Sequence, residues 1–169
     1  LKTSYIDIGT AEATGNCAIA AAAIPSGGYT RRAGTCADTT GDEFTFGLTM
    51  EKGWDGGAVY VIPIVANVNA SPSGTFTLAI NGHCTPAGTA RPALSTSNSQ
   101  NASFTSWTAQ YSEEQVATPA ITLLGTCPNA ATEDISIDFR ARVTAAPGQI
   151  ADIRVLKFLL VYGKTRDSR

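Results

Sequence analysis

The sequence predicts an all-β protein, an antiparallel jelly-roll-like β-sandwich with an N-terminal loop-rich extension. Three observations predict this class. Only 15% of the 169 residues are charged and 43% are hydrophobic, a composition that suits short strands joined by turns better than Glu-, Lys- and Leu-rich helices. From residue 42 onward, apolar runs alternate with clusters of Gly, Pro, Asn and Ser, as in antiparallel sandwiches. No internal repeat is visible, so a solenoid is not expected.

The first strand of the sandwich is expected at residues 43–50. Phe44, Phe46, Leu48 and Met50 alternate there with polar or small residues. A period of two places these four side chains on one face of a strand, as a half-buried strand requires.

Two further strands follow this one. Residues 58–66 form a β-branched run that predicts a strand covered on both faces, and Pro63 within it predicts a bulge or an edge position, because proline cannot donate to the ladder. Residues 76–80 alternate again. We expect that strand to end in a tight turn at Asn81 and Gly82, a dipeptide suited to positive φ.

The pattern weakens between residues 85 and 115, where we expect a long surface excursion with one short strand. Three apolar runs end the chain, at residues 120–124, 135–143 and 153–162. Each is expected to form a strand.

The chain is long enough for one domain, which we expect to be a jelly-roll β-sandwich over residues 42–169. Residues 1–41 are broken by glycines and are expected to form an N-terminal extension or cap. The alanine run near residue 20 is the one helical candidate. Because the sequence starts at Leu1 without Met, we expect a processed or trimmed product.

The four cysteines, Cys17, Cys36, Cys84 and Cys127, have no CxxC spacing, so a zinc site is not predicted. Of the three pairings, Cys17 with Cys36 and Cys84 with Cys127 is favoured, because each joins neighbouring stretches in loops or at strand ends. Disulfides would fit an oxidising or extracellular environment. Buried free thiols in a particle assembled in the cytosol are the alternative.

The sequence offers little for catalysis. It has a single His, and none of the HExxH, GxSxG or Walker motifs. We therefore expect no enzyme, no catalytic residue, no metal site and no cofactor. The net charge of -2 and the absence of a basic patch argue against nucleic acid as a partner. No apolar run approaches the roughly 20 residues that a membrane-spanning helix needs, so no membrane partner is expected.

Two aromatic residues in the long excursion, Trp107 and Tyr111, are candidates for stacking on a glycan, as aromatic faces do in lectin sandwiches. Core packing or packing between subunits is the alternative role for these side chains.

The order of motifs between residues 42 and 162 resembles that of small jelly-roll virion proteins carried by tailed bacteriophages. The resemblance rests on GDEF at 41–44, KGWDGG at 52–57, PAITL at 119–123 followed by GT at 125–126, FRAR at 139–142, and AD at 151–152 leading to LLVY at 159–162. Near the start of the chain, GNC at 15–17 is also similar. Residues between Cys84 and Gln115 do not share it.

This resemblance implies a non-enzymatic structural protein of a bacteriophage virion. It would be a capsid decoration, cement or head-spike protein that forms a homotrimer and binds the major capsid protein or other virion proteins at the particle surface, outside the cell when mature. Oligomerisation would bury patches that a monomer exposes. The alternative is a receptor- or glycan-binding module of a tail fibre or lectin, with a surface glycan as partner.

Overall fold

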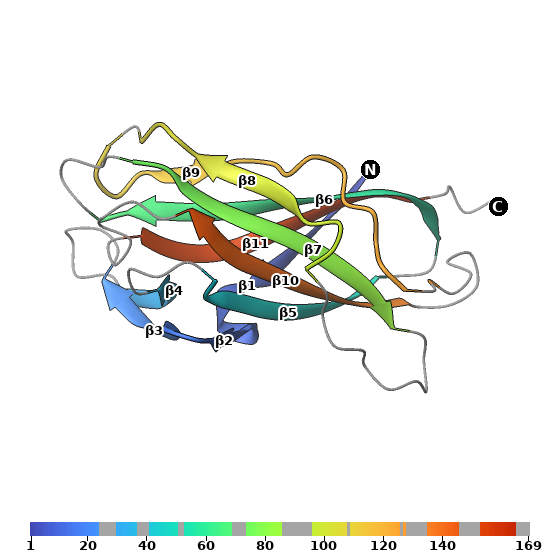
Figure 1. Ribbon diagram of the computed structural model, residues 1–169, viewed down its shortest axis with the longest axis horizontal. Coiled ribbons are helices and arrows are strands. Elements are labelled where there is room, and N and C mark those ends of the chain that lie inside the picture. The colour runs from blue at the N-terminus through green and yellow to red at the C-terminus, as the bar shows by residue number, and fades with distance from the viewer. Residues whose placement is uncertain are drawn as a thin grey trace.

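The chain forms two antiparallel sheets packed face to face in the computed structural model, a jelly-roll β-sandwich as the sequence predicts (Figure 1). The structure describes residues 1–23, 30–36, 41–50, 53–68, 74–85, 96–107, 109–125, 127, 135–145 and 153–164. These residues contain no helix with the length and hydropathy that crossing a membrane requires.

The first sheet, called sheet A, has the strand order β3-β4-β11-β6-β9, and β1 also pairs with β11. Its strands are β1 (Lys2–Asp7), β3 (Cys17–Ala23), β4 (Thr30–Cys36), β6 (Trp54–Asn67), β9 (Glu113–Gln115) and β11 (Ile153–Lys164). The long β6 and β11 form its centre and pair along most of their length.

The second sheet, called sheet B, has the order β2-β5-β10-β7-β8. Its strands are β2 (Glu12–Thr14), β5 (Glu43–Met50), β7 (Phe76–Thr85), β8 (Gln100–Phe104) and β10 (Ile135–Ala145). A short 3-10 helix, η1 (Ile8–Thr10), leads from sheet A to sheet B, and Asp7 caps it by accepting a hydrogen bond from the Gly9 N–H.

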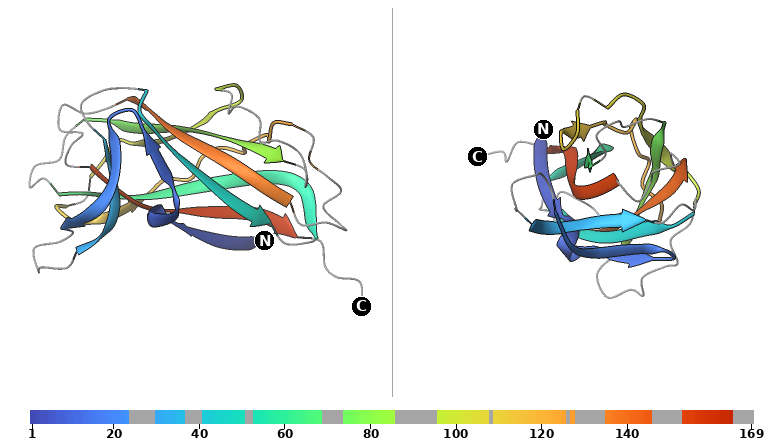
Figure 2. Two further views of the ribbon diagram at one scale, coloured as in Figure 1. Left: turned by 90° about the horizontal axis from the view of Figure 1, so that it is seen from below. Right: turned by 90° about the vertical axis from the view of Figure 1, so that its left-hand side faces the viewer.

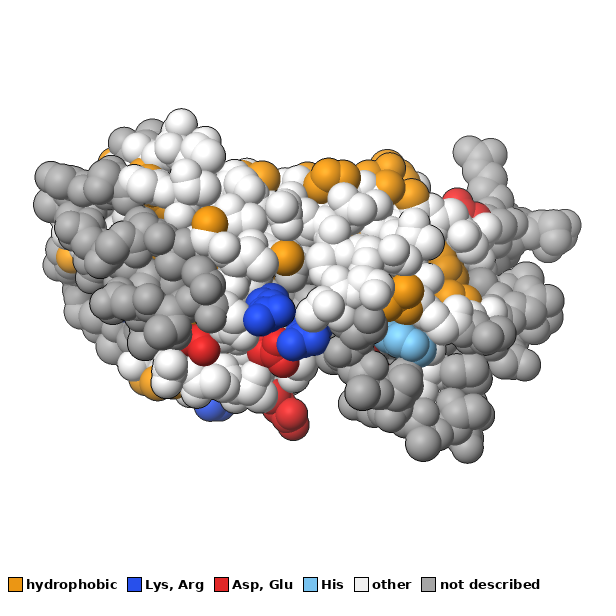
Figure 3. Space-filling model, viewed as in Figure 1, with side chains coloured by type: hydrophobic (Ala, Val, Ile, Leu, Met, Phe, Trp, Pro, Cys, Tyr) orange, Lys and Arg blue, Asp and Glu red, His pale blue; other side chains and the backbone are white. Residues whose placement is uncertain are grey.

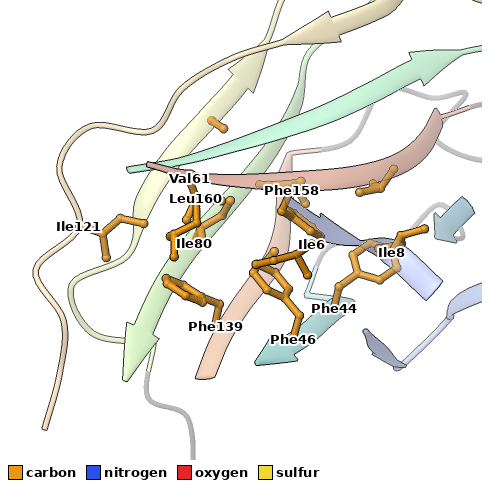
Figure 4. Packing of buried hydrophobic residues seen from close by; sticks show 14 of the residues in the cluster. Ile6, Ile8, Phe44, Phe46, Val61, Ile80, Ile121, Phe139, Phe158 and Leu160 are labelled. Atoms are coloured by element: carbon orange, nitrogen blue, oxygen red, sulfur yellow. The ribbon is translucent and has the colours of Figure 1, made fainter. Parts of the chain in front are cut away.

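The inward faces of the two sheets form one core, and the alternation predicted for residues 43–50 is confirmed at its centre. Phe46 of β5 lies between Phe139 of β10 and Phe158 of β11, with ring centroids 5.4 Å and 4.2 Å away. Figure 4 shows these rings with the aliphatic side chains around them. The stack therefore joins sheet B to sheet A through side chains rather than through backbone pairing.

The second half of β6 is covered on both faces, as its β-branched sequence predicts, but in the first part of the predicted run 58–66 Ala58 and Tyr60 are exposed, so the prediction is wrong there. On the outer side of sheet A, Ala33 of β4 forms a small buried cluster with Ile64, Ala66 and Leu156. Pro63 lies just before the stretch that pairs with β9, which begins at Ile64. Among the described strands, β6 thus has no neighbour on that side at Pro63, consistent with an edge position.

The first 41 residues contribute strands to both sheets. β1 pairs with β11 and β2 pairs with β5, and the N-terminal strands, in blue, lie against the body of the sandwich (Figure 2). The division into a cap and a domain at residue 42 stays a prediction. The alanine run is a strand and not a helix, because β3 pairs with β4 along its whole length and this pairing outweighs the helix propensity of alanine.

Two expectations about the second half of the chain are wrong. Asn81 and Gly82 do not form a turn but continue β7, since they pair with Arg140 and Phe139 of β10. Residues 120–124 are not a strand either. They make one isolated bridge to each sheet, Val59 with Ile121 and His83 with Leu124, because this segment crosses from sheet A to sheet B.

The structure contains the two disulfides that the spacing favours. Cys17 and Cys36 are bonded across the register of β3 and β4. Cys84 and Cys127 tie β7 to the crossing segment, which also bonds to β7 through the Leu124 carbonyl, 2.8 Å from the Cys84 N–H.

Candidate functional site

Trp107 is engaged in packing. Its ring stacks on Phe104 at the end of β8, with centroids 6.0 Å apart and planes 17° apart. Its indole N–H donates to the Gly74 carbonyl at 3.3 Å. The side chain is half-buried against the main core, so one face of the indole already has a partner inside the protein.

Tyr111 lies in the loop before β9 and is also half-buried. Its backbone has a left-handed conformation, with φ of 64°, and its N–H donates to the Asn67 carbonyl at 2.7 Å. Among the described residues, no ring contact joins Tyr111 to Trp107. The structure places both aromatics near the same end of β8 and β9 but does not bring them together as a stacking platform.

His83 and Cys84 do not form a catalytic pair. The Cys84 sulfur is bonded to Cys127 in a disulfide, so it is not a free thiol. The His83 imidazole Nδ1 lies 2.8 Å from the carbonyl oxygen of Cys84. Within the described part of the chain, no group of three His, Cys, Asp or Glu side chains is arranged to hold a metal ion.

A concave site with several polar side chains lies instead on the outer face of sheet B. A hollow of about 210 Å³ is lined by Ala79, Asn81, Thr96, Ser99, Arg140, Arg142 and Thr144; we call it the sheet B hollow. Figure 3 looks onto this face and shows basic side chains gathered over its middle, with acidic side chains beside them.

Strand register explains why these residues meet. Arg142 of β10 faces Ala79 of β7, which in turn faces Asn101 of β8. One row along, Arg140 faces Asn81. Alanine is short, so the row with Ala79 leaves a depression between longer neighbours, and this depression forms the floor of the hollow.

Asn81 fixes one wall of the hollow. It is only 2% exposed, and its side-chain amide donates to the Ser97 carbonyl at 3.3 Å. The segment held in this way carries Thr96 and Ser99, and the Ser99 hydroxyl donates to the Thr96 carbonyl at 2.8 Å. Asn98 between them has φ of 57°, a left-handed conformation that asparagine tolerates better than most residues. The wall is thus built by local hydrogen bonds and one amide anchor.

The two arginines of the hollow differ in their partners. The Nε of Arg140 forms an ion pair with Glu43 on β5, and both side chains are less than one-fifth exposed. Glu43 directly faces Arg142 in the register, yet it bonds to Arg140 one row along. The carboxylate therefore neutralises Arg140.

Among the described residues, Arg142 has no such neutralising contact. Its Nε is buried and has no hydrogen-bond partner among the described residues. A buried donor without a partner costs roughly 1–3 kcal/mol. Gly41 makes room for this side chain: a Cβ at Gly41 would lie 2.9 Å from the Arg142 Nη2.

The lining of the hollow combines hydroxyls, an amide and guanidinium groups with apolar surface, which makes up the larger part of it. Such groups bind and orient a polar ligand, and a few well-placed polar groups are what fix a ligand in a pocket. The volume is below the roughly 300–1,000 Å³ of sites for drug-sized molecules, so the hollow suits one ring-sized unit.

Sequence reasoning missed this site, although it noted FRAR at 139–142. The signal in that stretch is the pair Arg140 and Arg142, two residues apart on a strand and hence on one face. In a chain with 15% charged residues, two arginines on the same strand face are unusual enough to mark a surface.

No protein-family model matches the sequence, and no curated protein sequence matches it. Solved structures do resemble the fold. A family 35 carbohydrate-binding module from Clostridium thermocellum has a TM-score of 0.58 at 11% identity, covering 96% of this chain and 100% of that one.

Two other modules resemble the fold over a similar extent. The CBM36-1 domain of a multidomain xylanase from the hindgut metagenome of Trinervitermes trinervoides has a TM-score of 0.53 at 7% identity, covering 97% of this chain and 100% of that one. The C-terminal CBM6 of a laminarinase from Zobellia galactanivorans has a TM-score of 0.52 at 10% identity, covering 95% and 99%. At these identities the likeness shows the jelly-roll fold, over nearly the whole of each domain. None of these three structures is a virion protein.

Proposed function

We propose that this domain is a non-enzymatic carbohydrate-binding module and that the sheet B hollow holds its ligand. The observation that carries this proposal is the hollow itself, with hydrogen-bonding side chains from two strands and one loop lining a depression of one-ring size. The similarity in fold to carbohydrate-binding modules supports it.

The chemistry of the lining suits a sugar. A pyranose presents hydroxyls that both donate and accept, together with short apolar C–H surfaces. Thr96 and Thr144 offer hydroxyls with the same dual capacity. The Ser99 hydroxyl already donates to the Thr96 carbonyl and offers an acceptor oxygen, and Ala79 offers an apolar contact. A site built in this way rejects molecules that leave its polar groups unpaired.

A glycan array followed by calorimetry on the best ligand tests the proposal, with Thr144→Tyr as the blocking variant. Thr144 is exposed at the hollow, and tyrosine is favoured in strands, so this change should fill the hollow without unfolding the sheet. We expect at least tenfold weaker binding. Thr49→Tyr is the matched control, since Thr49 is exposed on the same sheet but does not line the hollow. Equal binding by both variants, or no glycan bound at all, would contradict the proposal.

A virion structural role is the second candidate, and an apolar patch on the outer face of sheet A favours it. Tyr5 is 70% exposed and Tyr60 is 37% exposed. The strand between them, β11, carries Leu159, which faces Tyr5, and Val161, which faces Tyr60. Oligomers bury patches of this kind. In this role the domain would form a trimer and bind the major capsid protein at the particle surface.

Light scattering coupled to size-exclusion chromatography tests the second role. A stable trimer that dissociates in Tyr5→Ser/Leu159→Ser would support it, and a monomer at high concentration would overturn it. Both proposed roles place the domain outside the cell, where its two disulfides would persist.

A further inference from the structure

We infer that the sheet B hollow selects a saccharide that carries a negatively charged group, a carboxylate or a sulfate, and that Arg142 is the residue that recognises it. This inference rests on the proposed function and names the ligand class of the same site. Its starting point is the difference between the two arginines.

Among the described charged groups around the hollow, Arg142 is the cation without a carboxylate partner. Arg140 is paired with Glu43. Asp138, on the outer face of β10, accepts a hydrogen bond from Thr85 at 3.1 Å. It lies on the side of Arg140 away from Arg142. As far as the described residues go, no carboxylate lines the hollow. The positive charge of Arg142 is therefore offset by no acidic group within the lining.

The geometry of Arg142 also suits an anion. The side chain is half-buried and lines the hollow, and because its Nε is closed off from solvent, an anion in the hollow would bind at the terminal Nη groups. Carboxylates and sulfates present two oxygens that can accept from a guanidinium in parallel, which makes arginine the usual partner for them. A neutral hydroxyl offers one weaker acceptor.

The wall that contains residues 96–99 favours a saccharide over other acidic molecules. Thr96 and Ser99 bring hydroxyls, and Asn81 an amide, to the lining that also contains the guanidinium. An acidic sugar could contact Arg142 with its charged group and this wall with its ring hydroxyls. An acidic peptide has carboxylates but offers no ring of hydroxyls to the same wall.

Calorimetry with three matched oligosaccharides tests the inference: a galacturonate oligomer, its carboxyl-reduced neutral counterpart and a sulfated galactan oligomer. We expect at least one charged oligomer to bind about tenfold more tightly than the neutral one, with the advantage shrinking in high salt. Comparing the galacturonate oligomer with the sulfated galactan oligomer shows whether the site recognises a carboxylate or a sulfate. Poly-glutamate serves as the acidic non-sugar probe and is expected not to bind.

The variants assign the effect to Arg142. Arg142→Gln should weaken binding of the charged oligomer about tenfold and so bring its affinity down to that of the neutral oligomer measured with the same variant. Arg142→Lys keeps the charge but not the paired donors and should retain only part of the preference. Arg154→Gln on sheet A is the matched control, since it removes the same charge from the other sheet and should change nothing.

The outcomes separate this inference from the proposed function. If neutral and charged oligomers bind equally and Arg142→Gln changes neither, the inference is wrong and carbohydrate binding stands. If poly-glutamate binds as tightly as the sugars, the saccharide class is wrong. If no oligosaccharide binds, here or on the array, both the inference and the proposed function fail.

Discussion

Glu43 of β5 and Arg140 of β10 form an ion pair although the strand register places Glu43 opposite Arg142. The diagonal contact neutralises Arg140, and no other described residue supplies a carboxylate to Arg142. A chain with a net charge of -2 thereby keeps a local positive charge on one face of its sandwich.

Removing the carboxylate at this pair should raise the positive charge of the hollow. We expect Glu43→Gln to strengthen binding of a charged oligosaccharide several-fold, because it removes one negative charge beside the two arginines of the hollow. The same variant should lose about 1–2 kcal/mol of stability, since a partly buried charged hydrogen bond is removed. Calorimetry and urea denaturation measure the two effects. Glu12→Gln, on the exposed edge strand β2, changes the charge equally, and an affinity gain in both variants would contradict a local effect.

The two disulfides should differ in their contributions to stability. The bond from Cys84 to Cys127 spans 43 residues and the bond from Cys17 to Cys36 spans 19. In the chain-entropy model these loops correspond to about 4 and about 3 kcal/mol. Urea denaturation of Cys84→Ala/Cys127→Ala should therefore give the lower midpoint of the two double variants. The reverse order would show that loop length does not govern the effect here.

Gly34 on β4 should tolerate no side chain. A Cβ there would lie 2.6 Å from Cε1 of Phe44, which is fully buried. Overpacking a core in this way costs about 1–3 kcal/mol, so Gly34→Ala should lower the melting temperature by several degrees. Gly47→Ala is the control, because its nearest contact, at 3.2 Å, is the side-chain oxygen of Asp138. Equal melting temperatures for the two variants would refute the close packing.

Trp107 should matter for stability and not for ligand binding. Its ring packs on Phe104 and its N–H is bonded to Gly74, so Trp107→Ala should lose about 2 kcal/mol, less than for a fully buried tryptophan. Glycan affinity measured well below the melting temperature should stay within twofold of the wild type. Loss of glycan binding in a folded Trp107→Ala variant would show that the binding site lies at the loop that contains Trp107 and not at the sheet B hollow.

Much of the fold could be predicted from the alternation of apolar and polar residues along the chain. On β5 and β10 the inward residues are apolar at every second position, and a period of two identifies such strands without tertiary information. The expectations failed where pairing outweighed local preference. The alanine run of β3 and the Asn81-Gly82 dipeptide both lie in strands, because each has a partner strand that its own sequence does not reveal.

The candidate site could not be predicted because strand register brings its residues together. Ala79, Ser99 and Arg142 are far apart in sequence and meet only when β10 pairs with β7. A one-residue slip of that pairing would turn the arginines toward the core. Aromatic residues were the obvious glycan candidates from sequence, but burial against Phe104 could not be foreseen for Trp107.

A titration of the ¹⁵N-labelled domain with its best array ligand, followed by amide chemical shifts, tests whether the sheet B hollow holds the ligand. We expect the largest shift changes at the hollow, at Ala79, Asn81, Ser99 and Thr144. Changes centred on residues 107–115 or on the outer face of sheet A, with the hollow unaffected, would contradict this expectation.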